Sequence, residues 1–165
     1  MNENPQPSDW QNWVAGQGPK LLLFARQQSR TEADAQDLVQ EAVLECWRRS
    51  NGLPPAPALV FATIRRRAID MARSNERRAR REQTADPGEP AWFDTSPEDR
   101  ERCRIIQSAM NRLPQIYREV ITLKIWGELT FTEIAEALEL NPHTVASRYR
   151  YGLEELRKLT KEVLA

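Results

Sequence analysis

The chain has 165 residues, enough for one or two small domains, and its 24 basic and 24 acidic side chains give a formal net charge of zero. Two cysteines far apart and a single histidine exclude a metal site of the usual Cys/His spacing, and two lone thiols fit a reducing compartment. The N-terminus is polar and the longest apolar run covers only residues 21–24, so we expect a cytoplasmic protein with no membrane contact of its own.

The N-terminal part predicts a flexible tail followed by a broken helix. Residues 1–8 are polar and contain two prolines. A helix is expected to begin at Ser8 or Asp9 and to be interrupted at Gly16 and at Gly18-Pro19, because these residue types break helices. Helical character resumes over residues 21–25.

The next helix is expected to be amphipathic and to begin after Thr31, with Asp34 at the position of a capping-box acid. The stretch 32–45 carries five acids and no base, which indicates either a solvated acidic face or a face that contacts a basic protein. Apolar residues at spacings of three and four predict the buried stripe, which consists of Ala35, Leu38, Val39, Ala42, Val43, Cys46 and Trp47.

A proline-rich segment at 51–58 predicts a stiff loop, and a helix is expected from Ala58 to about Arg81. Its second half is strongly basic, since residues 65–81 hold eight arginines against two acids, a local charge of +6. Arginine suits both phosphates and stacked bases, so the block predicts a polyanion site, with a solvated helix end as the alternative.

Residues 83–98 contain three prolines and four acids and predict a flexible linker between two domains. Trp92-Phe93 is unusual in such a segment. The pair is expected either to pack against one of the domains or to anchor a partner. The predicted organisation is therefore a tail at 1–8, a domain at 9–82, a linker at 83–98 and a second domain at 99–163.

The second domain is also expected to be helical, with one helix from Ser96 or Pro97 to Leu113 and another from Pro114 to Gly127. No segment alternates with the period of two that a strand requires. The predicted fold class is therefore all-α, with two small helical domains.

Residues 129–158 predict a helix-turn-helix, a motif whose second helix fits the DNA major groove. Thr130 or Thr132 is expected to cap the first helix, and Asn141 the second. Glu139 stands where the turn usually has glycine, at a cost of roughly 1 kcal/mol. The alternative is an ordinary antiparallel helix pair. The second helix has an inward stripe of Val145, Tyr149, Gly152 and Leu156 and an outward stripe of His143, Ala146, Ser147 and Arg150.

At this point four segments resemble the bacterial RNA polymerase sigma-70 family. They are DAQDLVQEAVLECW at 34–47, AID at 68–70, RLPQIYREVITLKIWGELTFTEIAEAL at 112–138 and TVASR at 144–148. The resemblance is particularly to the short extracytoplasmic-function (ECF) group, which keeps only regions 2 and 4, and it covers nearly the whole chain after the tail. It implies a sigma factor that binds core polymerase and promoter DNA.

The resemblance also implies roles for residues of the first domain. The helix that carries Asp37, Leu38, Gln40 and Glu41 corresponds to the surface that docks on the β′ clamp helices of the polymerase. The loop 51–58 corresponds to the loop that receives a flipped base of the −10 element. The helix 58–75 corresponds to the strand-opening segment. The implied −10 contacts are Asn51, Arg65, Arg66, Arg67 and Arg73.

Region 4 corresponds to 99–163, where the helix-turn-helix would read the −35 element and an apolar groove would hold the β flap. Glu139, Ala146 and Tyr151 depart from the family pattern, because the last two stand where basic residues are common. From helix geometry we expect Arg150 to read a base and Arg148 to contact phosphate. The implied −35 contacts are Asn141, His143, Thr144, Ala146, Ser147, Arg148, Arg150 and Tyr151.

Three functions are compatible with this sequence. The first is a sigma factor that opens promoters and is held in check by an anti-sigma factor. The second is a sigma-like decoy that binds polymerase or an anti-sigma partner without initiating. The third is a stand-alone helix-turn-helix repressor, which would not need the acidic helix, the loop and the arginine helix in this order. No Cys/His pair and no glycine-rich phosphate loop occurs, so we expect neither an enzyme nor a cofactor.

Overall fold

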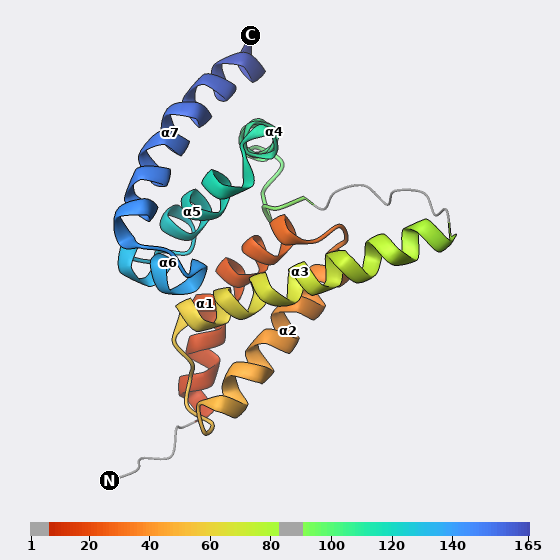
Figure 1. Cartoon of the computed structure of the whole chain (residues 1–165), viewed down its shortest axis with the longest axis vertical. Helices are drawn as coiled ribbons and strands as arrows, with labels where there is room; N and C mark the ends of the chain where they lie inside the picture. Colours follow the sequence, from red (N-terminus) through yellow and green to blue (C-terminus); the bar gives the residue numbers. More distant parts are fainter. Residues whose placement is uncertain (1–6, 83–90) are drawn as a thin grey trace. The chain divides into compact units, whose positions relative to one another are not determined.

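The computed structural model describes residues 7–82 and 91–165, and within them the regular structure is entirely helical. The chain divides into two compact units, Met1–Pro90 and Ala91–Ala165 (Figure 1). The all-α prediction is confirmed. The expected tail, up to residue 6, and residues 83–90 of the expected linker lie outside the described residues.

The first unit is built from three helices that all pack against one another: α1 (Pro7–Gln28), α2 (Glu32–Arg49) and α3 (Pro57–Glu82). Phe24 of α1 meets Phe61 of α3 edge to face, with ring centroids 5.5 Å apart. This geometry is favoured by the opposite charges of ring face and ring edge. The largest fully buried side chains of this unit are Leu21, Phe24, Leu38, Val60, Phe61 and Ile64.

The predicted interruption of the first helix is wrong, because α1 continues through Gly16 and Pro19. A proline inside a helix removes one backbone hydrogen bond and costs about 3 kcal/mol. Tertiary contacts on both sides of Pro19 offset this cost. Trp10 and Trp13 bind the loop after α2 before the proline, and the buried residues Leu21 and Phe24 follow it.

The start of α2 follows the prediction, since the Thr31 hydroxyl accepts a hydrogen bond of 3.0 Å from the Asp34 N–H. Four members of the predicted stripe, Ala35, Leu38, Ala42 and Cys46, are buried. Trp47 was expected in the core but is 42% exposed. Its ring instead meets Trp10 edge to face, at a centroid distance of 6.0 Å.

An ion pair joins the end of α1 to the start of α2. Arg26 is buried and donates two hydrogen bonds of 2.8 Å to the Glu32 carboxylate. The hydrogen bonds from Arg26 lower the pKa of Glu32 below its ordinary value of 4.5. A group whose pKa is lowered by folding stabilises the fold above its unfolded pKa, and this contribution is lost as the pH falls through the folded pKa.

We therefore expect Glu32→Gln to lower the free energy of unfolding at neutral pH and to have no effect in acid. The loss at neutral pH should stay below about 1 kcal/mol, because the Glu32 side chain is 43% exposed and water screens the pair. Urea denaturation at neutral and at acid pH measures the difference. Asp37→Asn, which removes the same charge from the exposed side of α2, is the control. Equal losses at both pH values would contradict the assignment.

The second unit contains α4 (Arg100–Arg112), α5 (Gln115–Ile125), α6 (Phe131–Leu138) and α7 (Pro142–Leu164), with α7 packing against the other three. Helix α5 ends before Gly127, as the sequence predicts. The largest fully buried side chains are Met110, Val120, Ile121, Leu123, Ile134 and Val145.

The beginning of this unit corrects part of the predicted linker. Trp92 is only 2% exposed, and its backbone N–H donates a hydrogen bond of 3.0 Å to the Gln107 side chain. Phe93 packs on Trp126, with ring centroids 5.6 Å apart. Residues 91–93 therefore belong to the second unit, and of the two interpretations of Trp92-Phe93 the packing one is correct.

Candidate nucleic-acid interface

The first helix of the helix-turn-helix, α6, begins with a complete capping box. The Thr130 hydroxyl accepts from the Glu133 N–H at 3.1 Å, and the Glu133 carboxylate accepts from the Thr130 N–H at 3.0 Å. Of the two threonines considered from sequence, Thr130 is therefore the cap. Two backbone donors that the helix itself cannot use are satisfied in this way.

The turn after α6 contains the strained residue that the sequence predicts. Glu139 adopts φ 56° and ψ 47°, the left-handed region that favours glycine. The N–H groups of Glu139 and Leu140 both reach the Ala135 carbonyl, the latter at 2.9 Å. The turn is thus closed by backbone hydrogen bonds, and the chain tolerates a glutamate at a cost of roughly 1 kcal/mol.

The second helix, α7, starts at Pro142 behind the Asn141 cap, whose side chain accepts from the His143 N–H at 2.8 Å. Its predicted inward stripe is buried in part, since Tyr149 and Leu156 are only half-buried. Val145 and Gly152 are buried, and Tyr149 meets Phe131 of α6 edge to face at 5.5 Å. These contacts fix the rotation of α7 about its own axis.

The opposite side of α7 carries the residues expected to face DNA. His143 and Arg150 are exposed, while Thr144, Ala146, Ser147 and Arg148 are half-buried. The Arg150 guanidinium lies over the ring of Tyr151, 5.0 Å from its centroid, and a long hydrogen bond of 3.4 Å runs from Arg150 to the Tyr151 hydroxyl. Tyr151, where a basic residue was expected, therefore supports the neighbouring arginine.

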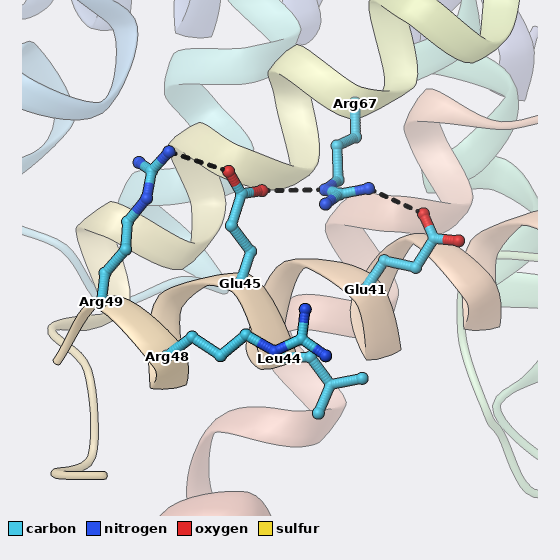
Figure 2. A pocket seen from close by; sticks show the side chains of 6 residues that line it. All are labelled: Glu41, Leu44, Glu45, Arg48, Arg49 and Arg67. Carbon is cyan, nitrogen blue, oxygen red and sulfur yellow. Dashed lines mark hydrogen bonds and ion pairs between the residues drawn. The ribbon is translucent and has the colours of Figure 1, made fainter. Parts of the chain in front are cut away.

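The basic helix of the first unit has a different arrangement from the one expected, because two of its arginines are paired with acids of α2. Arg66 reaches Glu45 at 2.7 Å. Arg67 reaches Glu45 and Glu41, each at 2.9 Å. Arg49 adds a further contact to Glu45 at 3.1 Å, which Figure 2 shows with the two pairs of Arg67. Among the other candidates, Arg65 is half-buried and Arg73 is exposed.

Glu45 lies at the centre of this cluster, and the sequence did not predict it as a site residue. Burial raises the pKa of Glu45, but the hydrogen bond from Arg67 and the charges of the three neighbouring arginines outweigh it, so the pKa lies below its ordinary value. The carboxylate is therefore kept ionised at neutral pH. The signal that could have found it is the pair of opposite charge blocks on consecutive helices.

The same side chains line an open hollow between α2 and α3, shown in Figure 2. Leu44 is its apolar member, and the other lining residues are all charged. They are Glu41, Glu45, Arg48, Arg49 and Arg67. Within the part of the chain that the structure describes, no group of three or more His, Cys, Asp or Glu side chains is arranged to hold a metal ion.

The surface of α2 expected to contact a protein is present in part. Asp37, Gln40 and Glu41 are exposed. Leu38 is fully buried, so its expected surface contact is wrong. Its side chain belongs to the inward stripe with Ala35 and Ala42, and it acts by holding α2 in place.

The loop between α2 and α3 is compact and has two residues with positive φ, Asn51 at 54° and Gly52 at 82°. The side chain of Asn51 is exposed, as a base contact requires. Two indole groups of α1 reach the loop: Trp10 donates to the Gly52 carbonyl and Trp13 to the Pro55 carbonyl, both at 3.1 Å. Sequence reasoning missed this contact, since it joins residues 42 positions apart.

Among the described helices, none combines the length and the apolar character that a membrane span requires.

Comparisons with known proteins match the two units separately. A model described as "Sigma-70 region 2" matches residues 14–78, and one described as "Sigma-70, region 4" matches residues 103–156. The chain is 30% identical to the ECF RNA polymerase sigma factor SigK of Mycolicibacterium vanbaalenii, over 75% of this chain and 67% of SigK. It is 28% identical to the ECF RNA polymerase sigma factor RpoE of Cereibacter sphaeroides, over 85% and 80%.

Two solved structures share the fold. The sigma factor RpoE, in complex with the anti-sigma factor NepR from Bartonella quintana, aligns with a TM-score of 0.71 and 20% identity, covering 93% of this chain and 98% of the other. CnrH, in complex with the cytosolic domain of CnrY, aligns with a TM-score of 0.66 and 22% identity, covering 95% and 90%.

Proposed function

The chain belongs to the ECF group of the sigma-70 family, and from this premise we propose that it binds core RNA polymerase, recognises the −35 and −10 promoter elements and promotes strand opening. The observation that carries the proposal is the order of the two matched regions, each within its own compact unit. Within this proposal the chemistry of RNA synthesis belongs to the polymerase. The chain acts as a non-enzymatic initiation factor in the cytoplasm.

The proposed −35 contacts are on α7 and at its N-terminus. Asn141 and the first turn offer backbone N–H groups and the positive end of the helix dipole to phosphate. Arg150, exposed and stacked on Tyr151, has the planar fork that pairs with both acceptors of guanine. The remaining proposed contacts are His143, Thr144, Ala146, Ser147 and Arg148.

The proposed −10 contacts are Asn51 in the loop and Arg65, Arg66, Arg67 and Arg73 on α3. Because Arg66 and Arg67 already pair with Glu45 and Glu41, promoter phosphates must compete with these carboxylates. The Arg66–Glu45 and Arg67–Glu41 pairs are exposed and contribute at most about 1 kcal/mol each, so a polyanion that offers several phosphates can displace them. The Arg67–Glu45 pair is partly buried and is the stronger restraint. Because displacing the carboxylates costs free energy, tight DNA binding by these arginines would be restricted to promoters already engaged by polymerase.

Transcription in vitro with core polymerase tests the proposal. Core enzyme alone should not initiate at a cognate promoter, and addition of the chain should give specific initiation. The free chain should bind duplex poorly, since its net charge is zero and each unit reads only a few bases. Tight, sequence-specific duplex binding by the free chain would instead favour a repressor.

A second candidate is a sigma-like decoy that occupies polymerase or an anti-sigma partner without initiating. The pairing of Arg66 and Arg67 with acids favours it, as do the uncharged side chains of Ala146 and Tyr151. The same transcription assay separates the two. A decoy would bind core enzyme and inhibit initiation by another sigma factor.

We include an anti-sigma factor among the proposed partners, because one of the two solved structures that share the fold is a sigma factor in complex with an anti-sigma factor. The candidate contacts are the exposed apolar side chains of the two units. Trp92 is no longer among them, since it is buried. Purification of the chain from native cells should return a partner besides polymerase, and recovery of polymerase alone would count against it.

The proposed polymerase contact predicts the effect of a surface change on α2. Asp37→Ala combined with Gln40→Ala should weaken core binding and leave the free energy of unfolding within about 0.5 kcal/mol, because both side chains are exposed. Glu41 is spared, because its removal would also take away one of the two carboxylates that pair with Arg67. Core affinity and urea denaturation measure the two quantities. Glu76→Ala, an exposed acid of α3, is the control, and unchanged core affinity in the double variant would mean that this face is merely solvated.

A further inference from the structure

Two tryptophans of α1 bind the loop that connects α2 to α3. The indole N–H of Trp10 donates to the Gly52 carbonyl and that of Trp13 to the Pro55 carbonyl, both at 3.1 Å. Both side chains are half-buried, and their rings meet each other at a centroid distance of 5.7 Å. Trp10 also meets Trp47 at 6.0 Å, so the loop is backed by three indoles.

The other hydrogen bonds of the loop are local, between residues close together in the chain. The Ser50 hydroxyl donates to the Leu53 carbonyl at 2.6 Å, and the Gly52 and Leu53 N–H groups reach the carbonyls of Trp47 and Ser50. Asn51 and Gly52 both sit at positive φ, a conformation that costs a non-glycine residue roughly 1 kcal/mol. The local hydrogen bonds and the two indole hydrogen bonds together offset that cost at Asn51.

The same contacts limit what the loop can offer to a base. Three of its carbonyls, at Gly52, Leu53 and Pro55, already accept hydrogen bonds. The exposed groups at and beside the loop include the Asn51 side chain, Leu53 at 52% exposure and Trp47 at 42%. One amide beside an apolar and an aromatic surface suits an unstacked base, which gains by stacking and by a single polar contact.

We propose that Trp10 and Trp13 are positioning residues for the loop between α2 and α3. They hold Asn51, Leu53 and Trp47 in the arrangement that receives an unstacked base of the −10 element in single-stranded promoter DNA. This inference rests on the proposed function. Neither indole N–H touches the base, because both are used on loop carbonyls. They act by removing alternative loop conformations before DNA binds, which spares the ordering cost at the moment of binding.

The test compares holoenzymes, each made from core polymerase and the full-length chain, on oligonucleotides that carry the −10 non-template strand. One variant is Trp10→Phe with Trp13→Phe, which keeps aromatic rings and removes both donors. A second replaces both tryptophans by 3-benzothienylalanine, in which sulfur stands in place of the N–H, so the shape and the packing are kept. Trp126→Phe, in the second unit, is the matched control.

The measured quantity is base discrimination, the ratio of affinities for the preferred and a substituted base at each −10 position. We expect both variants to keep core affinity within about twofold and to lose discrimination at one position. One net hydrogen bond changes an equilibrium constant by roughly fivefold, so the expected loss of base discrimination is of that order for each donor removed. The Trp126→Phe control should discriminate as the wild type does.

The possible outcomes test the positioning role of the tryptophans and the proposed function separately. If the benzothienyl variant discriminates like the wild type, the hydrogen bonds do not position the loop and the inference is overturned. If both variants lose overall affinity equally for every base, the tryptophans support folding only, which also overturns it. If the wild-type holoenzyme itself shows no −10 preference, the proposed function fails, and the inference falls with it.

Discussion

Gly152→Ala is expected to destabilise the second unit by about 1–2 kcal/mol and Gly152→Val by more, although alanine is the better helix former. A Cβ atom at Gly152 would lie 2.9 Å from the Tyr117 Cβ and 3.0 Å from the Ile121 Cδ1. The Tyr117 Cβ moves only with the backbone of α5, so α5 and α7 would have to separate. Such overpacking costs typically 1–3 kcal/mol, against a gain of up to about 1 kcal/mol in helix propensity.

Gly16→Ala is the matched control, because the same chemical change meets no atom within 4 Å. It should stabilise the first unit by about 0.5–1 kcal/mol, opposite in sign to Gly152→Ala. Hydrogen exchange measured at increasing urea concentration, on peptides from each unit, separates the two transitions. Unchanged stability of Gly152→Ala would mean that the α5–α7 contact is looser than the geometry indicates. A loss of −35 binding should accompany the destabilisation, since α5 seats the proposed reading helix.

The features that sequence predicts well are those set by neighbouring residues. The Asn141 cap and Pro142 fix the start of α7 locally, and the positive φ of Glu139 follows from the tightness of the turn between two short helices. The stripe of Val145 and Gly152 follows from the helical period alone. These signals need no knowledge of the rest of the molecule.

Predictions failed where distant contacts outweigh local preference. Gly16 and Pro19 favour a break, but the first helix runs through them because its two ends are anchored at different places in the unit. Trp47 has the spacing of a core residue, yet it packs against Trp10 at the edge of the core and remains partly exposed to solvent. Neither contact follows from residues nearby in the chain.

The candidate site shows the same division. The arginines of α3 and the acids of α2 are both visible as charge blocks in the sequence. Their pairing at Glu45 depends on how each helix is rotated about its axis, which periodicity gives only approximately. At Leu38 the helical period was the better guide. The family motif implied a surface contact, whereas the apolar stripe predicted the core, and the side chain is buried.

Arg150→Ala is expected to weaken promoter binding by about 1–3 kcal/mol and to relax the preference at one −35 position. With Val145 and Gly152 buried, Arg150 lies on the exposed side of α7, and its guanidinium is already ordered by the ring of Tyr151. Tyr151→Leu, which removes the stacking ring but leaves the arginine, should give a smaller loss at the same position. The measurement is binding of polymerase carrying each variant to a set of −35 substitutions.

Arg148→Ala is the contrasting variant, because Arg148 is half-buried and lies beside the proposed reading face. It should weaken binding to all sequences alike and lower the slope of log affinity against log salt by about one unit, as expected for one lost phosphate contact. Titrations at two salt concentrations separate this behaviour from that of Arg150→Ala. If both variants lose affinity uniformly, or if Arg150→Ala keeps the full preference at every −35 position, the proposed groove face of α7 is wrong and the reading residues lie on another side of the helix.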